Sequence, residues 1–316
     1  MRIALKVDVD TLRGALEGVP ALAELLAKRG VPATFLFSVG PDNTGRAIRR
    51  IFRPGFLRKV FRTSVASHYG WRTLCYGTLL PGPDIGRRGA AVMRAVRDAG
   101  FEVGVHAYDH IRWQDQVAHR DEAWTRREMD RAVTRFQDIF QALPATFGAA
   151  GWQLNVHALQ RQQELGFAYC SDTRGTHPFL PAMAGRRFSC PQLPTTLPTM
   201  DELIGRHGIT ADKVADHLLT ESARALPAGH VFTLHAELEG MALLGAFTRL
   251  LAGWREQGYA LGSLGELYAT LDPGRLPCHA VVNGEVAGRS GLLAVQGPEL
   301  MSSGAAPLRH DSLNFR

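Results

Sequence analysis

Four acidic and imidazole side chains stand directly after two segments that are predicted to be buried strands. Asp8 and Asp10 end the first segment, and a spacing of two places both carboxylates on one face of a strand. His106 and His110 follow the other, and their i,i+4 spacing places both imidazoles on one side of a helical turn. One carboxylate and two imidazoles form a ligand set that leaves positions open for water and substrate. The sequence therefore predicts a site for one divalent metal ion, and this set accepts zinc, manganese, cobalt or nickel.

Two further reactive side chains, Asp172 and His235, end later predicted strands. Taken alone, each is more often structural, because a histidine is commonly a plain hydrogen-bonded residue and an aspartate after a strand commonly caps a turn or helix. Six such residues at strand ends together favour a functional site. The other nine histidines show no such placement, and we interpret them as surface or structural residues.

The elements that must position these residues alternate between strands and helices. Strands are predicted at 3–9, 33–39, 101–105, 145–148, 167–171, near Gln192, 230–235 and 259–261. Helices are predicted at 19–29, 84–98, 121–142, 154–165, 211–226, 243–257 and 264–271. About seven or eight strand–helix units without a Gly-rich dinucleotide loop favour an α/β fold of the closed (β/α)-barrel type over a doubly wound sheet. In such a barrel the chemistry lies at the C-terminal ends of the strands.

The chain is expected to form one main domain with an insertion and a tail. Residues 1–272 are assigned to the barrel, and residues 46–62 lie in a long insertion after the second strand. From residue 273 to 316 the pattern gives way to Gly, Ser and Pro with scattered polar residues. This last segment is predicted to be a loosely ordered tail outside the catalytic fold.

The insertion holds the basic charge of the chain. The net charge is +6, from 36 Lys and Arg against 30 Asp and Glu. Segment 46–62 contains no acid and seven bases, which are Arg46, Arg49, Arg50, Arg53, Arg58, Lys59 and Arg62. Apolar residues repeat between them at helical spacing, which predicts two short amphipathic helices in a membrane interface. The alternatives are a solvated helix packed on its own domain and, less favoured because no nucleic-acid module accompanies the patch, nucleic-acid binding.

Other features of the sequence bear on the compartment. The N-terminal sequence MRIALKVDVDT places acids where a signal peptide needs an apolar core. The sequence contains no run of 18 or more uncharged apolar residues, which is the length needed to span a bilayer. The four cysteines stand far apart without a CxxC pair, which favours free thiols in a reducing compartment. We expect a cytoplasmic protein, bound peripherally to an anionic membrane surface, the cytoplasmic face of the inner membrane.

The series Asp8-x-Asp10, then His106-x-x-x-His110, then a late His235 resembles the motifs of the polysaccharide deacetylase (NodB-homology) family. The resemblance implies a metal-dependent amide hydrolase on a distorted TIM-type, (β/α)7-like barrel. It covers roughly residues 3–271. Its longest stretches resemble the branch of the family that deformylates a lipid-linked sugar: FSVGPDNTGR at 37–46, SHYGW at 67–71, AAGW at 149–152, SDTRG at 171–175, LPTMDELIGR at 197–206 and LHAELEG at 234–240.

Membership of that branch implies a substrate and a partner. The substrate would be undecaprenyl-phosphate-linked 4-formamido-4-deoxy-L-arabinose. Its hydrolysis would give formate and the aminoarabinose lipid that is used for lipid A modification and for resistance to cationic peptides such as polymyxin. The basic insertion would then bring the barrel to the membrane, and its arginines could contact the carrier phosphate. The rival interpretations are an N-deacetylase of an acetylamino-glycan and a non-catalytic barrel that binds a lipid-linked sugar.

The resemblance also implies a role for each site residue. Asp8 matches the general base, His235 the general acid, and Asp172 the residue that orients or tunes that acid. The three implied metal ligands are Asp10, His106 and His110. A backbone N–H near Gly151 and Trp152 would contribute to binding the oxyanion.

Two departures from the family pattern concern the base. Val9 separates two acids that are usually adjacent in the family. The third motif usually begins with an arginine that steadies the base, and residues 148–152 contain none. Arg174 and Arg206 are the candidates to replace it and to contact the substrate.

Overall fold

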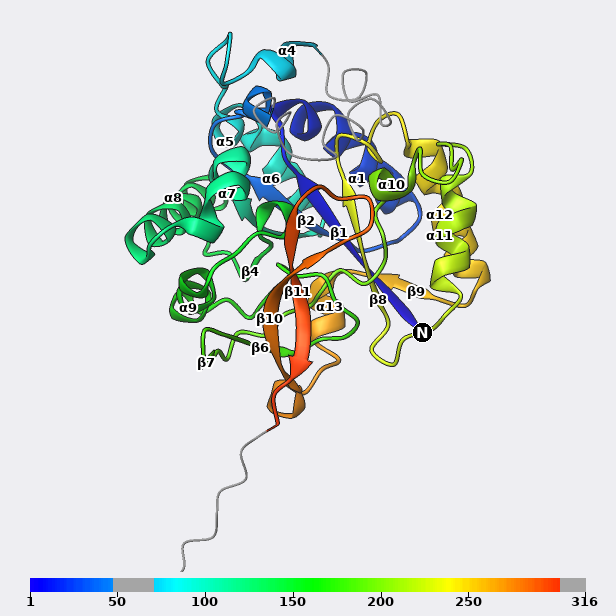
Figure 1. Ribbon diagram of the computed structural model, residues 1–316. Coiled ribbons are helices and arrows are strands. Elements are labelled where there is room, and N and C mark those ends of the chain that lie inside the picture. The colour runs from blue at the N-terminus through cyan, green and yellow to red at the C-terminus, as the bar shows by residue number, and fades with distance from the viewer. Residues whose placement is uncertain (48–70, 302–316) are drawn as a thin grey trace, which may run out of the picture.

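The computed structural model describes residues 1–47 and 71–301 of the 316-residue chain (Figure 1). Its main sheet has seven strands in the order β5-β4-β3-β2-β1-β8, with β9 paired to the beginning of β1. All of its strand pairs are parallel. The strands are β1 (Arg2–Val9), β2 (Thr34–Ser38), β3 (Glu102–Ala107), β4 (Thr146–Phe147), β5 (Tyr169–Cys170), β8 (His230–His235) and β9 (Ala260–Gly262).

Strand β1 is an interior strand of the sheet, next to the last strand in the order. All of its residues except Arg2 are buried, as the apolar run predicts for a parallel strand that is covered on both faces. It pairs with β2 on one side and with β8 on the other. The register places Asp8 opposite His235, so two expected site residues end neighbouring strands.

The sheet curls toward a barrel, and an irregular segment spans the gap between β5 and β8. On one side the Cys170 N–H donates to Pro191 O and the Leu193 N–H donates to Cys170 O. On the other side the Thr196 N–H donates to Val231 O at 3.0 Å. The strand predicted near Gln192 is thus an extended segment with isolated bridges rather than a regular strand. The predicted fold class, a distorted (β/α)7-type barrel, is confirmed.

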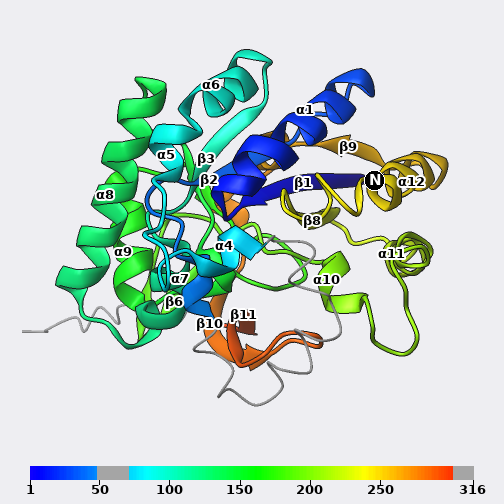
Figure 2. The same cartoon turned by 90° about the horizontal axis from the view of Figure 1, so that it is seen from above.

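Helices surround the sheet on three sides, and a hairpin lies on the remaining side (Figure 2). The α-helices are α1 (Val19–Lys28), α4 (Trp71–Cys75), α5 (Ile85–Arg88), α6 (Ala90–Asp98), α7 (His110–Gln116), α8 (Glu122–Phe140), α9 (Val156–Leu165), α10 (Met200–Leu203), α11 (Val214–Ser222), α12 (Leu244–Glu256) and α13 (Leu264–Tyr268). The shorter turns are a π-helix, η1 (Gly14–Gly18), and the 3₁₀ helices η3 (Val117–His119), η4 (Ala150–Trp152) and η5 (Pro273–Arg275). The helix predicted at 84–98 is two helices that meet at Gly89.

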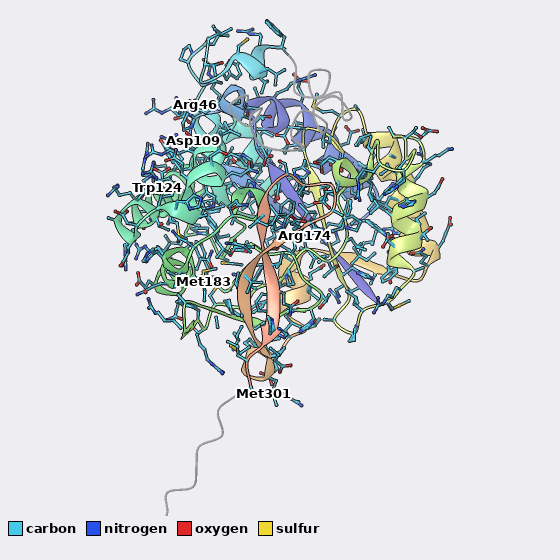
Figure 3. All side chains as sticks on the ribbon, viewed as in Figure 1. Arg46, Asp109, Trp124, Arg174, Met183 and Met301 are labelled. Atoms are coloured by element: carbon cyan, nitrogen blue, oxygen red, sulfur yellow. The ribbon has the colours of Figure 1, made fainter. Side chains whose placement is uncertain are left out.

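The prediction of a loosely ordered tail from residue 273 is wrong for the described part of that segment. Strands β10 (Cys278–Glu285) and β11 (Leu292–Glu299) form an antiparallel hairpin. It completes a second sheet with β6 (Leu180–Met183) and β7 (Arg186–Arg187). Main-chain hydrogen bonds join β11 to Arg174, which lies near the centre of the view in Figure 3. This segment is ordered by pairing with strands that are distant in the sequence. Because local polarity carries no information about such pairing, the sequence pattern did not predict the hairpin.

The basic insertion lies mostly outside the described residues. Of the seven bases predicted to contact membrane or carrier phosphate, the structure describes Arg46, whose Nε donates to Gly77 O at 3.0 Å. The two predicted amphipathic helices and the other six bases fall outside the description. Among the described residues, no helix is long and apolar enough to cross a bilayer.

Candidate active site

Three predicted metal ligands converge at the C-terminal ends of the strands. Asp10 follows β1, His106 lies in β3, and His110 is the first residue of α7. The Asp10 Oδ1 atom is 3.2 Å from His106 Nε2 and 3.4 Å from His110 Nε2. One ligand atom from each residue lies within 4.8 Å of the others. Among the described residues, these three form the only group of His, Cys, Asp and Glu with that convergence.

The beginning of α7 fixes His110. Asp109 is the N-cap of this helix, and its Oδ1 accepts from the Arg112 N–H at 3.0 Å. Its other oxygen accepts from Asn43 Nδ2 at 2.6 Å. An N-cap aspartate with both oxygens engaged holds the first turn, and therefore the His110 ring, against the barrel.

The hydrogen bond of His106 suits a metal ligand. His106 Nδ1 lies 2.7 Å from Gly148 O, so this nitrogen carries a proton and donates it to the carbonyl. In a neutral ring Nε2 then carries a lone pair, and it faces an oxygen of Asp10. Two acceptors that face each other are stabilised by a cation between them. A ligating imidazole usually donates its other N–H to a carbonyl or a carboxylate, as His106 does here to Gly148 O. The three residues therefore fit a divalent cation.

The charges of this cluster shift its pKa values. Burial opposes the charged form of Asp10, but His110, His106 and His235 outweigh it and hold the pKa of that carboxyl well below its usual range. Burial likewise disfavours the charged form of His106, but Asp8 and Asp10 together raise the pKa of the ring above its ordinary value. The site is thus strongly polarised around Asp10.

Asp8 and His235 lie beside this cluster. Asp8 Oδ1 is 3.8 Å from His106 Nδ1 and, within the described part of the chain, accepts no hydrogen bond. The other oxygen, Oδ2, is 3.4 Å from Lys6 Nζ. His235 Nδ1 is buried without a partner among the described residues, and its ring stands edge-on to Trp152 at 6.4 Å between centroids. One carboxylate oxygen and one imidazole nitrogen are therefore left without protein partners next to the metal ligands.

Asp172 does not contact His235 as the resemblance implied. Its Oδ1 accepts from the Ala149 N–H at 2.7 Å. Its Oδ2 accepts from Gln162 Nε2 at 2.8 Å and from Gln192 Nε2 at 2.9 Å. Burial raises the pKa of Asp172 even though these three donors favour the charged form. Through its hydrogen bond to the Ala149 N–H, Asp172 holds the beginning of the loop at 149–152 in place.

Neither arginine candidate reaches the proposed base. Arg174 Nη1 pairs with Glu202 Oε1 at 2.6 Å, and its guanidinium lies 5.1 Å from the centre of the Trp152 ring. Arg206 follows α10 and forms no ion pair with Asp8 among the described residues. The expectation that one of them replaces the missing family arginine at the base is wrong.

The loop at Gly151 and Trp152 has an unusual backbone. Gly151 has φ +64° and Trp152 has φ +52°, and the latter is a costly conformation for a residue with a side chain. The Trp152 N–H donates to Ala149 O at 3.1 Å. That N–H is therefore engaged within the loop, so the Gly151 N–H is the remaining candidate to donate to the oxyanion.

Sequence reasoning missed three buried ionisable residues. Glu237 Oε1 accepts from the Asp10 and Thr11 backbone N–H groups at 3.0 and 2.9 Å. Glu239 Oε2 accepts from the His235 N–H at 2.7 Å. Burial raises the pKa of each glutamate to about 8, aided at Glu237 by the charge of Asp10. The third is Lys6. Two signals could have found them: Lys6 shares one face of the LKVDVD strand with Asp8, and Glu237 and Glu239 stand in the turn that directly follows His235 at the end of β8.

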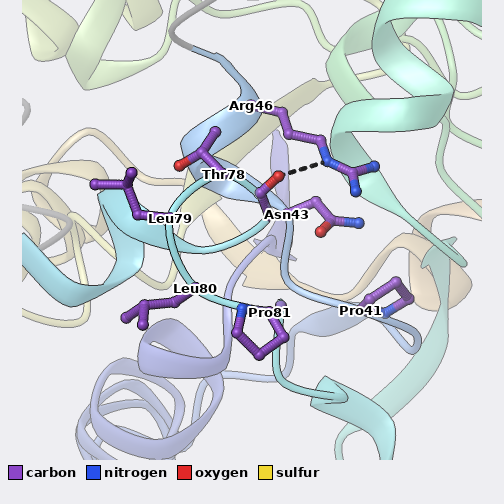
Figure 4. A pocket seen from close by; sticks show the side chains of 9 residues that line it. Pro41, Asn43, Arg46, Thr78, Leu79, Leu80 and Pro81 are labelled. Atoms are coloured by element: carbon purple, nitrogen blue, oxygen red, sulfur yellow. Dashed lines mark hydrogen bonds between the residues drawn. The ribbon is translucent and has the colours of Figure 1, made fainter.

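A cavity lies between residues 41–46 and the loop at 77–82. It has a volume of about 560 Å³ and is lined by Pro41, Asn43, Arg46 and residues 77–82 (Figure 4). Asn43 links it to the metal ligands, because its amide bonds the N-cap that precedes His110. The exposed fractions of Trp71 and Leu79 are 76% and 80%, so apolar surface accompanies this cavity.

An open metal-ligand set with a carboxylate and an imidazole beside it can activate water and protonate a leaving group, which are the two tasks of amide hydrolysis. On a distorted (β/α)7-type barrel, this arrangement defines an amide hydrolase of the carbohydrate-deacetylase class. The comparison with known families agrees, since the polysaccharide deacetylase model matches residues 2–170. The chain belongs to the polysaccharide deacetylase family.

Relatives of similar length share most of the chain. A protein of Shewanella sediminis named as the 4-deoxy-4-formamido-L-arabinose-phosphoundecaprenol deformylase ArnD is 36% identical over 93% of this chain and 94% of its own. A protein of Wigglesworthia glossinidia brevipalpis with the same name is 30% identical over 90% of this chain and 98% of its own. Among solved structures, a polysaccharide deacetylase from Mycobacterium smegmatis covers 90% of this chain and 94% of its own, with a TM-score of 0.61 at 18% identity, and supports the fold.

Proposed function

We propose that the protein is a metal-dependent deformylase of undecaprenyl-phosphate-linked 4-formamido-4-deoxy-L-arabinose. The observation that carries the proposal is the convergence of Asp10, His106 and His110 beside Asp8 and His235. The full-length similarity to two relatives named as this deformylase supports the substrate. The products would be formate and an aminoarabinose lipid that serves lipid A modification and polymyxin resistance.

The proposed mechanism assigns one task to each residue. Asp10, His106 and His110 would hold the divalent ion, zinc, manganese, cobalt or nickel, whose Lewis acidity makes an amide carbonyl more electrophilic and a nearby water more acidic. Asp8 would accept the proton of the attacking water at Oδ1, the oxygen without a hydrogen-bond partner in the described chain.

The remaining steps concern the oxyanion and the leaving group. His235 would donate a proton to the departing amine, because an amide anion cannot leave at neutral pH. The Gly151 N–H would stabilise the oxyanion. Asp172 would act indirectly, by holding the loop that carries Gly151.

Peripheral binding to the cytoplasmic face of the inner membrane is part of the proposal. A lipid carrier keeps its sugar at the bilayer surface, so the enzyme has to approach that surface. The basic segment 46–62 would contact anionic lipid and the carrier phosphate, each base near the surface contributing about 1 kcal/mol. Trp71 and Leu79 support the placement, because exposed apolar side chains are typical of an interfacial site, and Leu79 lines the same cavity as Arg46.

The central test is product analysis with the purified full chain. Metal-loaded protein should release formate from the lipid-linked formamido sugar, chelated protein should not, and restored metal should restore release. Activity that survives exhaustive chelation would remove the metal mechanism. Release of acetate from the acetamido analogue at an equal rate would favour the general N-deacetylase, and metal binding without turnover would favour a non-catalytic barrel.

Vesicle sedimentation tests the membrane part separately. Deleting 46–62 should abolish sedimentation with anionic vesicles, and W71A/L79A should weaken it, because both remove interfacial contacts. Leu143, 67% exposed on the loop after α8, offers a matched control, and L143A should sediment like the wild type. Unchanged sedimentation of the deletion variant would place the membrane contact elsewhere.

A further inference from the structure

A lysine is completely buried beneath the proposed base. Lys6 lies in β1 with 0% of its surface exposed. It is two residues before Asp8, so alternation along the strand places both side chains on the same face. A buried ammonium is costly unless it is paired and hydrogen-bonded, and lysine is among the residues least often buried without such partners.

Three groups surround the Lys6 ammonium. Its Nζ donates to Ser171 O at 2.9 Å and is 3.4 Å from Asp8 Oδ2. It also lies 5.3 Å from the centre of the Trp152 ring, within the range of a cation–π interaction. A carbonyl, a carboxylate and an aromatic face together fix the position of the ammonium, and through it one oxygen of Asp8.

The neighbouring backbone leaves room for this lysine. A Cβ on Gly148 would lie 3.2 Å from Lys6 Cε and 2.3 Å from Leu36 Cδ1. Any larger residue at 148 would therefore push against the lysine stem. The same residue carries the carbonyl that accepts from His106 Nδ1, so one loop serves both the ligand and the lysine.

No other strong base of the described chain can take this position. Lys6 and the His106 ring are the basic groups that lie within 4 Å of the Asp8 carboxylate. Arg174 is occupied by Glu202, and residues 148–152 contain no arginine. The cation beside the base comes from the same strand as the base itself, rather than from the third motif.

We propose that Lys6 is the positioning residue of the catalytic base: it holds Asp8 Oδ2 so that Oδ1 stays free to accept the proton of the attacking water. The proposal deepens the proposed function and rests on the role of Asp8 in it. Among the described residues no hydrogen bond or ion pair joins Lys6 to a proposed metal ligand, although its charge opposes protonation of the His106 ring; in this proposal it acts through Asp8. Methionine at this position keeps the length of the side chain and removes the charge, whereas arginine keeps the charge.

The kinetic test is a double-mutant cycle with K6M, D8N and the combined variant in the full-length protein. K6M should lower kcat for formate release about 10²-fold, with KM changed less than about threefold. K6R should recover most of the loss. In the D8N background K6M should change kcat by less than about twofold, because a residue that acts only through Asp8 has nothing left to position. Additive losses would overturn the proposal.

Two readouts separate this role from a general structural one. K6M should bind one metal ion per chain with a Kd within about threefold of the wild type in a cobalt titration, and loss of metal binding would overturn the proposal. K28M is the matched control, since Lys28 is 72% exposed and pairs with Glu24 at the surface. It should match the wild type in both assays.

Urea unfolding keeps the test independent of turnover. D8N should lower the unfolding midpoint of the Lys6 protein more than that of the K6M protein, because only the former leaves a buried ammonium without its carboxylate. Equal shifts would overturn the Lys6–Asp8 coupling even if the substrate were an acetamido sugar. A wild type that releases no formate would instead count against the proposed function, and this coupling would still be measurable.

Discussion

The strand-end site and the C-terminal hairpin both contact Trp152, and different kinds of interaction hold them. In the site, side chains extend from β1, β3 and β8, whose positions are set by parallel hydrogen-bond ladders, with one register shift between β2 and β3 beside His106. The hairpin is attached near its turn by Arg289, which pairs with Glu202 at 2.6 Å, bonds Thr199 at 2.9 Å and lies 4.7 Å from the Trp152 ring centre. The site depends on backbone pairing, whereas the hairpin depends on a few buried charges in addition to its backbone pairing with β6 and Arg174.

This difference separates activity from stability. A strand-end side chain can be replaced while the ladder that carries it persists, so its loss should mainly affect chemistry. Arg289 and Arg174 share the carboxylate of Glu202, which is completely buried. Removing one of these bases leaves a buried charge incompletely paired, so its loss should mainly affect folding.

The largest expected effect is that of Asp10→Ala. Loss of a ligand should remove metal from the purified protein and lower formate release by about 10³-fold or more, since Lewis acidity contributes several kcal/mol to the barrier. The unfolding midpoint should change little, because β1 keeps its pairing. Metal analysis and a formate assay on the same preparation test this. Full metal occupancy in D10A would contradict the assignment.

Asp8→Asn should lower turnover without removing the metal. The amide cannot accept the proton of water, so kcat should fall about 10²-fold while the metal content stays at the wild-type value. Comparison with D10A in the same assays separates the base from the ligand. Near-normal turnover of D8N would exclude Asp8 as the base.

The sequence predicted these two regions unequally for a physical reason. Asp8 and His106 lie near the ends of regular strands and Asp10 and His110 follow shortly after, so their local spacing already determines which face they share. Arg289 lies in the hairpin turn, and its partners are 87 to 90 residues away along the chain. The i,i+2 spacing of Lys6 and Asp8 also predicts that they share a face of the strand. Lys6 is interpreted from the sequence only as part of a buried segment, so this pair is not predicted.

Arg289→Met should lower the free energy of unfolding by about 2 kcal/mol and leave kcat within a fewfold of the wild type. This loss in the free energy of unfolding is smaller than the loss expected for breaking an isolated buried ion pair, because Arg174 still pairs with Glu202. Urea unfolding and the formate assay provide the two readouts. Arg275→Met, at an exposed position in η5, is the control and should change neither. A large loss of activity in R289M without loss of stability would contradict the claim that Arg289 serves stability rather than chemistry.

The contribution of this pair should depend on pH with a defined sign. Burial alone would raise the pKa of Glu202, but Arg289 and Arg174 lower it below the ordinary value of 4.5. An acid whose pKa is depressed by folding stabilises the folded state above its unfolded pKa and loses that contribution as the pH falls through its folded pKa. The difference between wild type and R289M in urea should therefore be full at pH 7 and shrink below about pH 4.5. A difference that grows on acidification would contradict the pairing.

Asp172→Asn has the smallest expected effect and tests the contrast most directly, because Asp172 stands at a strand end yet makes only structural contacts. The asparagine can still accept from Ala149 N, but its amide faces donors on Gln162 and Gln192, so these must reorient. Relief of a buried charge offsets part of that cost, and we expect a loss of about 1 kcal/mol in stability. Formate release should fall less than about tenfold, since the loop with Gly151 is loosened but His235 keeps its surroundings. If formate release fell as far as in D8N while stability stayed intact, Asp172 would instead serve the general acid His235. Position at a strand end would then predict a chemical role better than the hydrogen-bond partners do.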